Sequence, residues 1–102
     1  MQYRTMEKTG DRLSVLGFGC MRLPQRAGRI DEPRARAQLL LALENGVNYF
    51  DTAMPYHMGA SEPFLGRALD GGLRDKVKLA TKMPHWNVHS REDMDKFLAV
   101  QL

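Results

Sequence analysis

The apolar residues of the chain fall into short clusters whose spacing alternates between that of helices and that of strands. Ala35, Leu39, Ala42 and Leu43 recur with the period of a helix. Two later segments repeat this spacing, and their apolar residues are Phe64, Leu65, Ala68 and Leu69 in one and Met94, Phe97, Leu98 and Leu102 in the other. Between the helices, residues 47–50 and 77–81 predict two further strands.

Turn and capping residues indicate where the helices begin and end. Asp31 is a good N-cap for the first helix, and Asn45-Gly46 predicts its end through a left-handed residue. Ser61 is expected to open the second helix. Ser90 and Asp93 resemble a capping box at the start of the third helix.

The N-terminal part of the chain has the pattern of antiparallel strands. Residues 2–16 predict a β-hairpin with its turn at residues 8–11, and residues 16–21 predict a short buried strand rich in glycine. Gly28 and Pro33 are expected to bracket a loop before the first helix. After the hairpin, strand and helix then alternate three times, which predicts a parallel α/β sheet.

Three parallel strands leave two open sheet edges and too few helices to cover both faces. The chain also stops at Leu102, inside an apolar stripe. We therefore expect residues 1–102 to be one incomplete domain, the N-terminal part of a larger fold. The remainder of that fold, or self-association, would cover the open edges.

Composition excludes several classes of protein. The chain has 102 residues, of which 43% are hydrophobic and 26% charged, so it is neither a disordered tail nor a fibrous repeat. No apolar run approaches the ~18–20 residues of a membrane span, and no secretion signal precedes the first strand. A single cysteine, Cys20, excludes an internal disulfide and fits a reducing cytoplasm, where we expect this protein.

The net charge of +3 is concentrated in the N-terminal third. Such a surface could attract phosphate or nucleic acid through its arginines, which are Arg22, Arg26, Arg29, Arg34 and Arg36. No aromatic platform accompanies them, so we expect a solvated rim of arginines and no nucleic-acid partner.

Ionisable residues follow two of the predicted strands. Asp51 ends the strand at residues 47–50, Lys82 follows the strand at residues 77–81, and Tyr56 lies in the loop after Asp51. The lysine would lower the pKa of the phenol from its usual ~10, so that Tyr56 could donate a proton near neutrality. Asp51 would hold the lysine charged and oriented. Taken singly, each residue has a simpler role: a turn cap, a core tyrosine or a solvated lysine.

Four segments closely resemble the aldo-keto reductases, in the same order: residues 16–24, 46–53, 56–62 and 79–82. The resemblance implies the N-terminal hairpin and the first three β/α units of a (β/α)₈ TIM barrel. It also implies an oxidoreductase that reduces an aldehyde or ketone to an alcohol with a nicotinamide cofactor, NADPH or NADH. Of the family's catalytic Asp, Tyr, Lys and His, the first three map onto Asp51, Tyr56 and Lys82.

The family's catalytic histidine belongs to a strand beyond Leu102, so His57, His85 and His89 do not replace it, and the chain alone is expected to be inactive. By the same resemblance, the nicotinamide end of the cofactor is contacted by Gly19, Cys20, Met21, Arg22 and Asp51. A small-molecule carbonyl substrate, whose identity stays open, is expected to meet Met54, Tyr56, His85 and Trp86.

The same residues allow other interpretations. A regulatory subunit of this fold that binds nicotinamide without turnover is the alternative to the enzyme. Residues 83–86 resemble a branch of the family that carries a C-terminal iron–sulfur module, although no cysteines for it are present. His85 and His89 have a zinc-like spacing but Trp86 occupies the position of the glutamate, so we expect no metal site. Cys20 is expected to be a small buried apolar side chain.

Overall fold

The central sheet has three parallel strands. The structure, a computed structural model, describes residues 1–102. Strand β6 (Tyr49–Asp51) lies between β3 (Phe18–Gly19) and β7 (Lys78–Ala80). The register places Phe18 beside Phe50, and Phe50 beside Leu79. The predicted parallel sheet is therefore confirmed.

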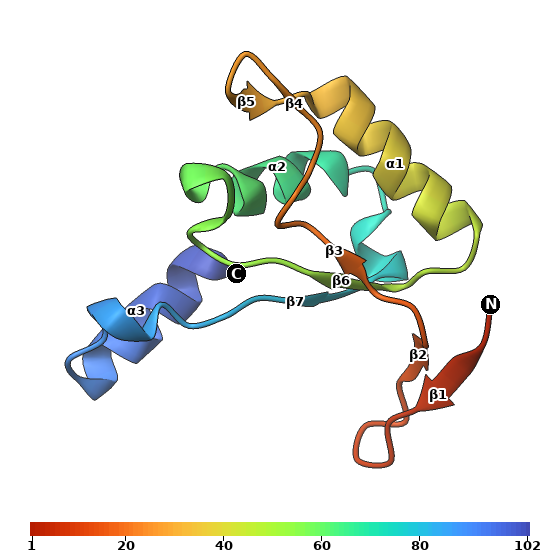
Figure 1. Cartoon of the computed structure of the whole chain (residues 1–102). Helices are drawn as coiled ribbons and strands as arrows, with labels where there is room; N and C mark the ends of the chain where they lie inside the picture. The colour runs from red at the N-terminus through yellow and green to blue at the C-terminus, as the bar shows by residue number, and fades with distance from the viewer.

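Three helices alternate with these strands. Helix α1 (Glu32–Glu44) connects β3 to β6, α2 (Ser61–Ala68) connects β6 to β7, and α3 (Arg91–Gln101) follows β7. Figure 1 shows α1 and α2 on the same side of the sheet, while α3 extends away beside the C-terminus. Only one face of the sheet is thus covered by helices.

The core lies between that covered face and helices α1 and α2. Phe50 is fully buried at its centre, and its ring centroid lies 5.3 Å from that of Phe18. The other buried members of this cluster are Cys20, Leu23, Ala35, Leu39, Val47, Phe64, Leu65, Ala68, Leu69 and Val77. Because these residues come from both helices and all three strand regions, the core holds the strands in register.

The remaining apolar residues lack this protection. Only 16 of the 102 residues are buried, and α3 contains none of them, although the sequence predicts an apolar stripe there. The predicted buried strand at residues 16–21 is also wrong in extent, since β3 covers two residues and Leu16 is 61% exposed. With β3 paired along one edge and the opposite face uncovered, nothing extends the strand or buries its ends.

The predicted N-terminal hairpin is confirmed. Strands β1 (Tyr3–Thr5) and β2 (Arg12–Ser14) pair antiparallel. Asn48 fastens the hairpin to the start of β6, because its Oδ1 accepts the Ser14 N–H at 2.7 Å and its own N–H donates to Ser14 Oγ at 3.0 Å. The hairpin therefore sits at the amino ends of the parallel strands, opposite to the edge that carries Asp51.

A second hairpin replaces the loop expected between Gly28 and Pro33. Strands β4 (Gln25–Arg26) and β5 (Arg29–Ile30) pair across Ala27 and Gly28, whose φ angles are 52° and 75°. Two left-handed residues between paired strands are typical of a type I′ turn. Alanine rarely adopts this conformation, which is why the sequence does not predict the hairpin.

The capping residues act largely as predicted. Asp31 Oδ1 accepts the Arg34 N–H at the start of α1. Ser90 Oγ accepts the Asp93 N–H at 3.2 Å, and Asp93 Oδ2 accepts the His89 N–H at 2.9 Å. The backbone hydrogen bond from His89, followed by those from Ser90, holds the pKa of Asp93 below its usual value.

Candidate active site

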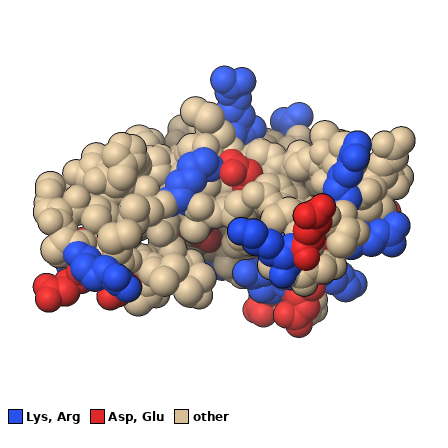
Figure 2. All heavy atoms as spheres, turned by 90° about the horizontal axis from the view of Figure 1, so that it is seen from below, with Lys and Arg blue, Asp and Glu red and all other residues tan.

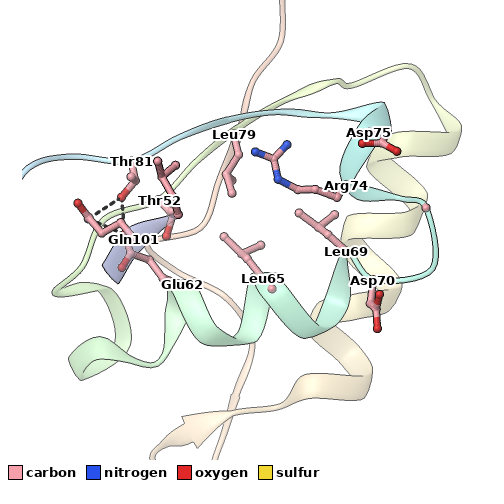
Figure 3. A pocket seen from close by; sticks show the side chains of 13 residues that line it. Thr52, Glu62, Leu65, Leu69, Asp70, Arg74, Asp75, Leu79, Thr81 and Gln101 are labelled. Atoms are coloured by element: carbon pink, nitrogen blue, oxygen red, sulfur yellow. Dashed lines mark hydrogen bonds between the residues drawn. The ribbon is translucent and has the colours of Figure 1, made fainter. Parts of the chain in front are cut away.

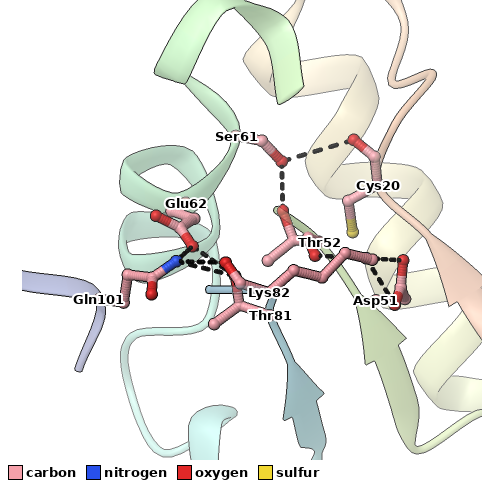
Figure 4. A network of polar contacts seen from close by, with 8 residues as sticks. All are labelled: Cys20, Asp51, Thr52, Ser61, Glu62, Thr81, Lys82 and Gln101. Carbon is pink, nitrogen blue, oxygen red and sulfur yellow. Dashed lines mark hydrogen bonds and ion pairs between the residues drawn. The ribbon is translucent and has the colours of Figure 1, made fainter. Parts of the chain in front are cut away.

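Lys82 and Asp51 meet at the carboxyl edge of the sheet. Lys82 Nζ lies 2.8 Å from Asp51 Oδ1 and 2.9 Å from Oδ2, and it also donates to the backbone oxygen of Thr52 at 2.8 Å (Figure 4). An ammonium group has three N–H donors. The three contacts can therefore occupy all of them and fix the position of the charge.

Tyr56 stands beside this ion pair. It is the first residue of the 3₁₀ turn η1 (Tyr56–Gly59), and its ring centroid lies 5.0 Å from Lys82 Nζ. That distance is within the range of a cation–π contact. The expected convergence of Asp51, Tyr56 and Lys82 at one edge is thus observed.

The surroundings of Lys82 favour its charged form. Desolvation alone would lower the pKa of the ammonium, but the hydrogen bonds and negative charge of Asp51, together with the neighbouring Tyr56, outweigh it and raise the pKa above its usual value. Lys82 therefore stays positively charged at neutral pH.

Two buried hydroxyl groups close the loop that carries Tyr56. Thr52 Oγ1 and Ser61 Oγ lie 2.9 Å apart, and Ser61 Oγ also donates to the backbone oxygen of Cys20 at 3.4 Å (Figure 4). Thr52 follows β6 and Ser61 begins α2, so this contact joins the two ends of residues 53–60. Both hydroxyl residues are fully or almost fully buried. The loop therefore starts and ends at fixed points.

Helix α3 supports the segment around Lys82. Gln101 Nε2 donates to the Lys82 backbone oxygen at 3.1 Å and to Glu62 Oε1 at 2.8 Å, while the Thr81 hydroxyl donates to the same carboxylate. A cavity of about 460 Å³ lies alongside, between α2 and β7, and is lined by Leu65, Leu69 and Leu79 among others (Figure 3). Asp51, Tyr56 and Lys82 do not line it, so this cavity is separate from the ion pair.

The residues predicted to contact the cofactor differ in exposure. Gly19 pairs with Asp51 across the sheet, and a Cβ added to it would meet no atom within 4 Å. Met21 and Arg22 are exposed. Cys20 is fully buried, its N–H donates to the Asp51 backbone oxygen, and its own oxygen accepts from a hydroxyl group of α2. Cys20 is thus the inaccessible member of the set, while Gly19, Met21, Arg22 and the side chain of Asp51 are accessible.

Burial also determines the chemistry of the Cys20 thiol. Desolvation, together with the charge of Asp51, raises its pKa to about 12. The thiol stays protonated at neutral pH and is not a nucleophile.

The residues expected to line a substrate pocket lie in loops beyond the strand ends. Met54 is half-buried just before the η1 turn. His85 and Trp86 belong to the 3₁₀ turn η3 (His85–Asn87), where their rings pack edge to face with centroids 5.1 Å apart. Trp86 is 53% exposed. Neither ring hydrogen-bonds to Asp51, Tyr56 or Lys82, so the substrate role of these residues stays a prediction.

The sequence did not predict three contacts around the site. Ser61 begins α2, as expected, but its side chain makes no capping hydrogen bond and contacts Thr52 instead. Gln101 contacts Glu62 and the Lys82 backbone, whereas the apolar stripe and the capping box that predict its helix do not include it. His57 adopts a left-handed conformation with φ 53°, and its ring contacts Leu23 and Gln25, which the sequence does not predict.

The rest of the surface offers few further sites. On the face shown in Figure 2, Lys and Arg side chains are scattered and several lie beside Asp or Glu, so this face has no continuous basic stripe. No three His, Cys, Asp or Glu side chains gather closely enough to hold a metal ion. No helix has the length and apolar content needed to cross a membrane.

Solved structures with a similar fold are aldo-keto reductases. The holo form of aldo-keto reductase AKR11C1 from Bacillus halodurans is 42% identical over 81% of this chain and 26% of that chain, with a TM-score of 0.67. Its apo form matches 100% of this chain and 32% of that chain at 36% identity and a TM-score of 0.74. The thermostable aldo-keto reductase Tm1743, in complex with the inhibitor epalrestat, shares the fold at 24% identity and a TM-score of 0.77, over 100% of this chain and 38% of that chain.

These matches support the barrel fold that the resemblance implies, with the N-terminal hairpin and the first three β/α units present in this chain. The chain spans between 26% and 38% of the length of these solved structures. Independently, the sequence model of the Aldo/keto reductase family matches residues 15–102. The chain belongs to the aldo/keto reductase family.

Proposed function

We propose that a complete barrel containing this chain reduces an aldehyde or ketone to an alcohol with NADPH or NADH. The observation that carries this proposal is the contact of Lys82 Nζ with both oxygens of Asp51, 5.0 Å from the Tyr56 ring. Family membership supports an oxidoreductase. The assignment of catalytic roles to these three residues is part of the proposal.

Tyr56 is the proton donor in this scheme. Reduction of a carbonyl places negative charge on its oxygen, and the phenol hydroxyl donates a proton to that oxygen as the charge develops. Lys82 stabilises the tyrosinate that remains, and Asp51 keeps the ammonium in place beside the ring. Because the salt bridge is already formed, little reorganisation is needed at the moment of proton transfer.

The carboxyl edge of the sheet suits a nicotinamide. Gly19 leaves open space beside Asp51, and the Asp51 carboxylate is 42% exposed even while it binds Lys82. Met21 and Arg22, which follow Cys20 and are exposed, offer the nicotinamide an apolar and a cationic contact. A reduced nicotinamide, when bound, supplies the hydride for the carbonyl carbon. Gly19, Met21, Arg22 and Asp51 would hold its nicotinamide end, with Cys20 buried beneath them.

The carbonyl substrate would bind above the same edge. Met54 and Trp86 supply apolar surface, and His85 a polar group, close in sequence to Tyr56 and Lys82. Pockets for small molecules commonly combine such apolar walls with a few polar groups. The cytoplasm, with its supply of reduced nicotinamide, is the compartment we propose.

The partner of this chain would be the rest of a barrel. Strands β3 and β7 each have a free edge, and the sheet face opposite α1 and α2 has no helix against it. Closing the barrel pairs both edges and packs side chains into the interior. A second copy of the chain is the alternative cover for the same edges.

The test is carbonyl reduction by a complete barrel that contains residues 1–102. The barrel is mixed with NADPH or NADH and a panel of aldehydes and ketones, and oxidation of the cofactor is followed by absorbance. We expect turnover that is lost in Tyr56→Phe and kept in Tyr3→Phe, a matched variant at the hairpin. Cofactor binding without turnover on any carbonyl would contradict the proposal and favour a regulatory subunit.

A further inference from the structure

The turn that carries Tyr56 is poorly supported by packing. None of the four residues of η1 is buried, and Met58 is 93% exposed. A cavity of about 730 Å³ separates part of this turn from the β4–β5 hairpin, with His57 and Arg29 among its lining residues. Apolar contacts therefore do little to fix the position of Tyr56.

The backbone of the turn is also strained. His57 and Met58 both have φ 53°, in the left-handed region that residues with a side chain rarely adopt. Such conformations persist where neighbouring interactions compensate for them, and they concentrate at functional sites. Backbone hydrogen bonds from the Tyr56 N–H to Ala53 and from the Ala60 N–H to His57 hold the two ends of the turn, and a side chain adds a further contact between them.

The His57 ring supplies that interaction. The Leu23 N–H donates to His57 Nε2 at 3.0 Å, and the amide nitrogen Nε2 of Gln25 is placed 2.9 Å from Nδ1. These partners are 34 and 32 residues away in the sequence. Leu23 is a member of the buried core, so the ring ties an exposed turn to a fixed point.

The hydrogen bonds determine the protonation of the ring. A backbone N–H can only donate, so Nε2 must carry a lone pair, and the proton of a neutral imidazole then sits on Nδ1. Since Nδ1–H then needs an acceptor, the oxygen and nitrogen of the Gln25 amide must be exchanged, so that the amide oxygen faces Nδ1. The ring is therefore used as one acceptor and one donor, which only the neutral form provides.

We propose that neutral His57 is a positioning residue that holds Tyr56 against the segment after β3. Residues 19–22 of that segment are the ones proposed to contact the nicotinamide, so His57 would link the proton donor to the cofactor side of the site. The inference rests on the proposed function. It gives His57 the role of setting the distance between Tyr56 and residues 19–22.

Two amide variants of His57 separate the effect of the hydrogen bond from that of the backbone conformation. In His57→Gln, the amide oxygen can reach the position of Nε2 and still accept from Leu23. In His57→Asn, the shorter side chain reaches only the position of Nδ1, although asparagine tolerates a left-handed backbone better than glutamine does. The hydrogen bond therefore favours glutamine, and the backbone preference favours asparagine.

The experiment compares these variants in a complete barrel that contains this chain. We expect His57→Gln to keep kcat within about threefold of the wild type and His57→Asn to lower it about tenfold, the size expected from one lost hydrogen bond. The KM for the cofactor should change little in both. An Asn variant equal to or faster than the Gln variant would overturn the proposal.

A second measurement does not depend on activity. Amide hydrogen exchange of Leu23 should stay slow in the wild type and in His57→Gln and become faster in His57→Asn. The ¹⁵N spectrum of the wild-type ring should show an unprotonated Nε2. Equal exchange of Leu23 in all three proteins would refute the bridge. If the wild-type barrel reduces no carbonyl but Leu23 behaves as expected, the proposed function fails while the bridge remains.

Discussion

Lys82 binds both carboxylate oxygens of Asp51, at 2.8 and 2.9 Å, although the two residues are 31 positions apart, Asp51 at the end of β6 and Lys82 in the segment after β7. The contact forms because β6 and β7 are parallel neighbours, with Asp51 paired to Ala80. Their carboxyl ends therefore reach the same edge of the sheet. This relationship leads to the first two predictions.

Replacing Tyr56 by phenylalanine should lower kcat of a complete barrel by a factor on the order of 10²–10⁴, the usual contribution of general acid catalysis. The ring and its contact with Lys82 remain, so cofactor affinity should change little. Steady-state kinetics and cofactor titration measure the two effects separately. Near-normal turnover in this variant would show that Tyr56 is not the acid.

Replacing Asp51 by asparagine should destabilise the protein in a pH-dependent way. Asp51 helps to raise the pKa of Lys82 in the folded state, so the stabilisation is fully present below the ordinary lysine value and is lost as the pH rises through the higher folded value. The difference in unfolding free energy between the wild type and Asp51→Asn should be constant near neutrality and shrink in strong alkali. Urea unfolding across this range measures it. A difference that grows with pH would contradict the ion-pair interpretation.

The buried contact between Thr52 and Ser61 should behave as a pair. Thr52→Val or Ser61→Ala alone leaves a buried hydroxyl with fewer partners and should cost about 1–3 kcal/mol. The double variant should cost less than the sum of the two single variants, because it leaves no buried hydroxyl without its partner. Denaturant unfolding of the four proteins gives this coupling. Strict additivity would show that the 2.9 Å contact contributes no coupling energy.

Two glycines should respond oppositely to alanine. At Gly46 φ is +89° and an added Cβ would lie 2.6 Å from the Tyr3 hydroxyl oxygen, so Gly46→Ala combines backbone strain with a clash and should destabilise by more than ~1 kcal/mol. Gly66 lies inside α2 with no atom within 4 Å of an added Cβ. Gly66→Ala should therefore stabilise by roughly 0.5–1 kcal/mol. Thermal unfolding distinguishes the two signs.

The isolated 102-residue chain should be poorly stable as a monomer or should self-associate. With 16 buried residues and two free sheet edges, it buries little apolar area to offset the entropy of folding. Sedimentation in dilute solution, combined with thermal unfolding, tests this. A monomer with a sharp, cooperative transition well above room temperature would contradict the prediction.

Local signals in the sequence are enough to predict the order of the elements and the three ionisable residues at one edge of the sheet. Helical spacing around Leu39 and capping by Asp31 are local properties, so they predict α1 without knowledge of the fold. Asp51 and Lys82 could be placed together because strand ends are local signals and parallel strands align them. The buried state of Cys20 also follows from its place in an apolar segment.

Burial of individual apolar residues and pairing of individual polar groups depend instead on contacts between distant segments. Leu16 and the stripe of α3 have the pattern of core residues, but burial depends on a partner across the sheet, and periodicity cannot supply one. The pairing of Ser61 with Thr52, and of His57 with Leu23, depends on loops that bring distant residues to within hydrogen-bond distance. The left-handed backbone of Ala27 belongs to the turn that pairs β4 with β5, and that of His57 belongs to η1, where the ring contacts Leu23 and Gln25.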